Sequence, residues 1–108
     1  MNKNSIISVE REARSISRRA FTGSRHVVYQ KEKHLVNCAE AIRKRWGVSP
    51  KNWQAKHVRW FLEVALVDKS CGTRYRYYRY LRSALIEMDK WDGVEAFVIG
   101  SWTKPVDS

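Results

Sequence analysis

The chain has little of what several protein classes require. Its 108 residues include only two cysteines, two prolines and five glycines. Cys38 and Cys71 form no CxxC pair, so we expect no zinc site. The sequence also lacks a glycine-rich phosphate loop, a paired histidine and carboxylate, and a nucleophile with an evident base. We therefore expect no enzymatic activity, no cofactor and no small-molecule substrate.

Long apolar runs are missing as well. The most apolar stretch, Trp60 to Val67, is interrupted by Glu63 and is far shorter than the roughly 20 residues that cross a bilayer. The sequence shows no recognisable signal peptide either, which favours a reducing compartment and a cytoplasmic location.

Positive charge is abundant. Lysine and arginine total 21 against 11 acidic residues, giving a net charge of +10. Residues 83–108 hold two lysines and five acidic residues, so the basic excess belongs to the first 82 residues. Such a field attracts nucleic acid through counterion release, and it would also suit an anionic membrane surface or an acidic protein. We expect duplex DNA as the partner, and no membrane.

Four arginines and four tyrosines interleave within residues 73–91, TRYRYYRYLRSALIEMDKW. Helical periodicity predicts that one stripe of this segment is buried, comprising Tyr77, Leu81, Ala84, Leu85, Met88 and Trp91. The opposite side is cationic. Because the arginine fork suits phosphate or guanine, we expect the main DNA contacts from Arg76, Arg79, Arg82 and Tyr75, with Arg74 at the helix start. The alternative is a solvated arginine surface with tyrosines used in packing.

Other helices are predicted around this segment. One runs from a cap at Ser24 or Thr22 to Trp46 and stops at Gly47, and a second runs from a cap at Asn52 to Asp68. Val94 to Trp102 is expected to pack back as a short helix or strand. These predictions divide the chain into a basic, weakly ordered or helical arm (1–22), a helical domain (23–102) and a loose end (103–108). Contacts that position phosphate are expected from Lys33, Lys44, Lys51, Lys56 and Arg59.

Two groups of residues carry a resemblance to a known family. The first is His57, Val58, Phe61 and Leu62, and the second is Ser70, Thr73, Leu81, Arg82 and Leu85. Their order and spacing resemble the N-terminal core-binding domain of tyrosine recombinases, the phage integrases with a SAM-like helical fold. The resemblance covers about residues 23–91.

The resemblance implies a small orthogonal bundle of about four helices that clamps duplex DNA at a site of integration or excision. It also implies a bacterial or phage-encoded, nucleoid-associated protein that could meet other recombinase subunits on DNA. The family's catalytic motif does not surround the tyrosines of residues 73–91, so a non-catalytic DNA-binding module is expected. Two alternatives stay open, namely a basic helical protein-interaction module and an RNA-binding domain that stacks bases on tyrosine.

Overall fold

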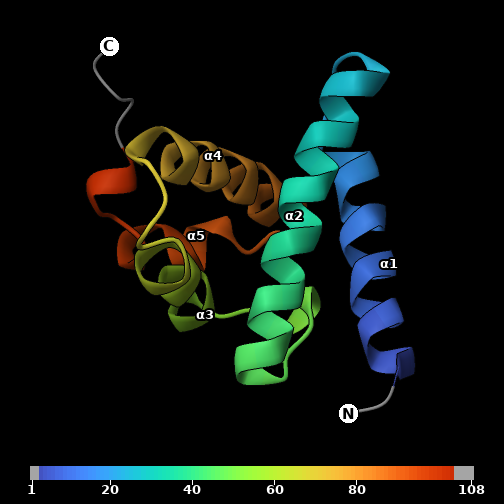
Figure 1. Cartoon of the computed structure of the whole chain (residues 1–108), viewed down its shortest axis with the longest axis horizontal. Helices are drawn as coiled ribbons and strands as arrows, with labels where there is room; N and C mark the ends of the chain where they lie inside the picture. The colour runs from blue at the N-terminus through green and yellow to red at the C-terminus, as the bar shows by residue number, and fades with distance from the viewer. Residues whose placement is uncertain (1–2, 104–108) are drawn as a thin grey trace.

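The computed structural model describes residues 3–103, with side chains from residue 9 onward, and no strand occurs within that part of the chain (Figure 1). Helices α1 (Lys3–Ala20) and α2 (Arg25–Trp46) lie side by side in antiparallel directions. Helix α4 (Cys71–Glu87) packs across α2, and the shorter α3 (Ala55–Trp60) and α5 (Trp91–Val94) lie on the same side of α2. The expected small all-α bundle is confirmed.

Helix α1 differs from the separate arm expected for residues 1–22. Val9, Ala13 and Ile16 are buried at helical spacing, and Phe21 extends the same side. Arg14 joins Glu10 on its own helix (2.7 Å) to Glu32 on α2 (2.8 Å). The apolar residues of this segment are sparse, but Val9, Ala13, Ile16 and Phe21 all belong to the buried core. The first helix is therefore part of the same core as residues 23–102. Residues 1–2 of the expected arm lie outside the described residues.

Both ends of α2 are as predicted. The Ser24 hydroxyl oxygen accepts a hydrogen bond from the Val27 amide (3.3 Å), and Gly47 ends the helix with a φ of 76°, a left-handed value that favours glycine. Between these caps Leu35, Cys38, Ala39 and Ile42 are buried, and Val28 and Trp46 are half-buried.

The segment before and through α3 departs from the prediction. Asn52, expected as a cap, belongs to a 3₁₀ turn, η1 (Pro50–Asn52), and Gln54 precedes the helix instead. The helix then continues as a π turn, η2 (Phe61–Ala65), in which the Leu66 amide donates to the Phe61 carbonyl (3.1 Å) rather than to that of Leu62. The Leu62 carbonyl is thus free to accept a bond from another element.

Helix α4 is capped by Ser70, whose hydroxyl oxygen accepts a hydrogen bond from the Thr73 amide (3.2 Å). It ends at Glu87 rather than Trp91, because Asp89 adopts a φ of 58° and turns the chain. Trp91 opens α5, which is followed by the 3₁₀ turns η3 (Glu95–Phe97) and η4 (Ser101–Thr103).

The C-terminal segment completes the core, since Val94, Val98 and Trp102 are buried. It consists of α5 and the two 3₁₀ turns, so it takes the helical one of the two forms expected for it. Residues 104–108 of the expected loose end lie outside the described residues. Within the described chain, no helix is long and apolar enough to span a membrane.

Candidate nucleic-acid interface

Three arginines project from the outer face of α4. Arg76, Arg79 and Arg82 are exposed, and Tyr75 lies half-buried beside them. Because the arginines are three residues apart on a helix that rises about 1.5 Å per residue, their Cα atoms advance about 9 Å along the axis. The structure therefore brings these four predicted contacts together. We call Tyr75, Arg76, Arg79 and Arg82 the α4 face.

The guanidinium groups of the α4 face have no carboxylate partner among the described residues. Among the described residues, the ion pairs involve Arg14, Arg19 and Arg59, and none includes Arg76, Arg79 or Arg82. Arg79 lies 5.8 Å from the Tyr75 ring centroid and Arg82 lies 5.7 Å from that of Trp91. Contacts of this kind orient a guanidinium without neutralising it. The face is thus a row of partly positioned cations.

The other tyrosines of α4 serve the core. Tyr77 packs edge-on against Phe61 (5.2 Å between centroids) and Tyr78 packs against Trp91 (6.0 Å). Tyr80 packs against Phe21 at 5.9 Å. Burial accordingly raises the pKa of Tyr78. The interleaved sequence therefore separates into an inner layer of rings and an outer row of arginines.

Arg74 makes contacts within the fold. Its Nε and Nη2 atoms donate hydrogen bonds to the Leu62 carbonyl oxygen at 3.2 and 3.0 Å, and its guanidinium lies 5.0 Å from the Trp102 ring centroid. The carbonyl is the one that the π turn leaves free, so the arginine fork ties η2 to the start of α4. Sequence alone gives no sign of this partner, because the π turn depends on packing.

Arg59 is engaged in a similar way. It pairs with Glu63 (2.7 Å) and donates to the Phe97 carbonyl oxygen (3.0 Å). Arg59 and Arg74 were both predicted to contact DNA. In the structure both bond other parts of the chain, and each would have to break or share these bonds in order to contact DNA.

The four predicted lysines belong to elements other than α4. Lys33, on α2, lies 5.6 Å from the Tyr29 ring centroid, and Lys51 is exposed on η1. Lys44 belongs to the last turn of α2 and Lys56 to the start of α3. The predicted lysines therefore come from α2, η1 and α3, whereas the predicted arginines of the α4 face come from one helix.

Two cations lie near the Trp46 ring at the end of α2, a cluster that the sequence analysis did not predict. Trp46 is half-buried, with Arg45 at 4.6 Å and Lys56 at 5.5 Å from its ring centroid. The run RKRW at residues 43–46, in which a tryptophan follows three cations, is the signal that could have indicated this cluster.

Of the three histidines, His57 is buried, His34 is half-buried and His26 is exposed. His57 is buried beside Trp46 (5.1 Å between centroids), and its Nδ1 accepts a hydrogen bond from the Gln54 amide (2.9 Å). Burial, and secondarily Lys56, lower its pKa. His34 bonds the Gln30 carbonyl oxygen through Nδ1 (2.7 Å) and lies between Tyr77 and Tyr80. Among the residues with described placement, no group of three or more His, Cys, Asp or Glu could hold a metal ion.

Comparisons with family models, with curated proteins and with solved structures give no match to this chain. The geometry of the α4 face and the charge of the chain therefore carry the functional argument.

Proposed function

We propose that this protein is a non-catalytic module that clamps duplex DNA through the α4 face at a site of recombination, as the N-terminal domain of a tyrosine recombinase does. The observation that carries the proposal is the exposed row of Arg76, Arg79 and Arg82, none of which pairs with a carboxylate among the described residues.

Size and shape support an approach to the major groove. An α-helix of 17 residues such as α4 is about 25 Å long, and the major groove is wide enough to admit an α-helix. Arginine can bond guanine in that groove with two parallel hydrogen bonds, or bond a phosphate. Tyr75 supplies a ring against which Arg79 rests. The α4 face therefore offers both base and backbone contacts from one rigid element.

Single-stranded RNA is a weaker fit. A stacking platform needs exposed rings, whereas Tyr77, Tyr78 and Tyr80 pack against Phe61, Trp91 and Phe21. Of the four tyrosines of α4, Tyr75 is the one that lies on the outer face.

The test is a binding titration. Duplexes selected from a randomised library would provide a preferred site, and fluorescence anisotropy would measure its affinity and that of random duplex at several salt concentrations. We expect Arg79→Ala to weaken the preferred site by about 1 to 3 kcal/mol more than random duplex if this side chain reads guanine. Replacing all three arginines should flatten the slope of log affinity against log salt by about 1.8 if Arg79 contacts guanine and by about 2.7 if it contacts phosphate, because each phosphate that a cation neutralises contributes about 0.9 to that slope.

The matched control is Arg18→Ala, which removes one exposed charge from α1. It should change affinity less than Arg79→Ala does. Equal losses for the two variants, or an affinity that does not depend on salt, would show that the α4 face is not the DNA-binding surface.

A further inference from the structure

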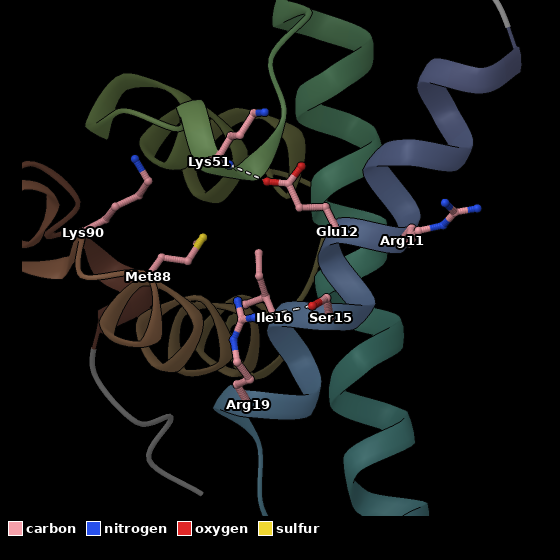
Figure 2. Close-up of a pocket in the computed structure, with 8 residues that line it drawn as sticks. All are labelled: Arg11, Glu12, Ser15, Ile16, Arg19, Lys51, Met88 and Lys90. Carbon is pink, nitrogen blue, oxygen red and sulfur yellow. Dashed lines mark hydrogen bonds between the residues drawn. The ribbon is translucent and has the colours of Figure 1, made fainter.

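A cleft of about 680 Å³ lies between α1, η1 and the chain reversal after α4 (Figure 2). Two contacts fix its walls. The Glu12 carboxylate accepts a hydrogen bond from the Lys51 backbone amide (2.9 Å), and Arg19 pairs with Glu87 at 3.4 Å. Three segments that are distant in the sequence therefore form one cleft, and none of its lining residues belongs to the α4 face.

Cations surround this cleft in excess. Arg11, Arg19, Lys51 and Lys90 line it, and Glu12 is the one carboxylate among its lining residues. Within the described residues, the ion pairs leave Lys51, Lys90 and Arg11 without a carboxylate partner. In Figure 2 the Arg11 side chain points away from the centre, while Lys51 and Lys90 stand along the opposite edge. This edge therefore carries two ammonium groups without an ion-pair partner among the described residues, and the Glu12 carboxylate lies beside Lys51 (Figure 2).

The interior of the cleft is apolar. Met88 is half-buried and points toward Ile16 across the cleft, and Ile16 itself is nearly covered (Figure 2). A methionine wall adapts to side chains of varied shape. A phosphate group would gain nothing from that wall, whereas a peptide can place an apolar side chain on it and carboxylates on the surrounding cations.

We propose that this cleft binds an acidic segment of a partner protein, with one apolar side chain of the segment against Met88 and its carboxylates on Lys51 and Lys90. The charge excess and the apolar floor together specify this occupant. The site is independent of the α4 face, so its test can fail while DNA binding succeeds, and the reverse.

The probe is a fluorescein-labelled peptide with a central phenylalanine flanked on both sides by glutamates, titrated with the full chain and followed by anisotropy. The double variant Lys51→Glu with Lys90→Glu should weaken binding at least about tenfold, because two attractions become repulsions. The matched control is Lys33→Glu with Lys44→Glu on α2, which makes the same charge change and should have less than about a third of that effect. A peptide with glutamine in place of glutamate should also bind at least about tenfold more weakly.

A second readout follows the apolar contact. Met88 is one of two methionines in the chain, so its ε-methyl NMR signal can be assigned, and we expect it to shift saturably with the glutamate peptide. Peptide binding that leaves this signal unmoved would overturn the proposal.

Four other results would also overturn it. These are no binding of the glutamate peptide, equal losses in the cleft and control variants, a loss of duplex affinity in the cleft variant without a loss for the peptide, and a self-association of the chain that the cleft variant abolishes. The third would make the cleft a phosphate surface, and the fourth would assign it to a second copy of the chain.

Discussion

Replacing Arg74 with alanine removes both hydrogen bonds that the guanidinium donates to the Leu62 carbonyl oxygen, at 3.2 and 3.0 Å. The π turn directs the Leu66 amide to Phe61 instead, so the Leu62 carbonyl loses these charged donors at a partly buried position. Leaving such a group unsatisfied costs about 1 to 3 kcal/mol. The Trp102 ring also loses the guanidinium that lies against it. We therefore expect Arg74→Ala to lower the free energy of unfolding by about 2 kcal/mol.

For a domain of this size, a loss of about 2 kcal/mol lowers the melting temperature by about 8 to 16 °C. Circular dichroism during thermal and urea unfolding would measure it. Arg76→Ala is the matched control, since Arg76 lies two residues further along the same helix, is exposed, and should change stability by less than about 0.5 kcal/mol.

The expected pattern is a crossover between the two variants. Arg74→Ala should lose stability, and Arg76→Ala should lose DNA affinity while it keeps its stability. If Arg74→Ala does not fold, Arg74→Lys keeps the charge without the fork and should show a smaller loss of stability. Full stability of Arg74→Ala, combined with a tenfold loss of DNA affinity, would refute the role assigned to Arg74 and restore it as a DNA-binding residue.

Two further predictions concern a buried histidine and a helix end. Because burial lowers the pKa of His57, the unfolded chain takes up its proton first as the pH falls, so stability should be full above about pH 6.5 and decline below it. Urea midpoints at pH 7.5 and 5.5 should show this decline, and His57→Gln should reduce it. Gly47→Ala forces alanine into a φ of 76° and should cost about 1 kcal/mol in urea unfolding. Gly93→Ala, where an added Cβ meets no atom within 4 Å, should cost nothing, and equal losses at the two glycines would contradict the left-handed cap.

Local signals predicted much of the fold. The cap at Ser24, one of the two residues predicted for it, and the stop at Gly47 were readable because each depends on residues within one helical turn. Asn52 was a wrong choice of cap, since Pro50 starts a 3₁₀ turn that carries the chain two residues further before α3 begins.

The candidate site shows the same division. Periodicity placed Arg76, Arg79 and Arg82 on the exposed side of α4, because the side of a helix that a residue occupies follows from its position in the sequence. It could not reveal that Arg59 and Arg74 bond carbonyl oxygens of other segments, since those partners are 38 and 12 residues away.

The sequence by itself determined a mainly helical chain, the two ends of α2, a basic first part and a cationic outer side of α4. These properties follow from periodicity, capping and composition, which act over a few residues. Only the tertiary structure decided that α1 belongs to the core, that the π turn engages Arg74, and that α1, η1 and the turn after α4 enclose a cleft. The physical reason is that each of these depends on which distant segments pack together, and a sparse apolar stripe or a single charged residue does not specify its partner.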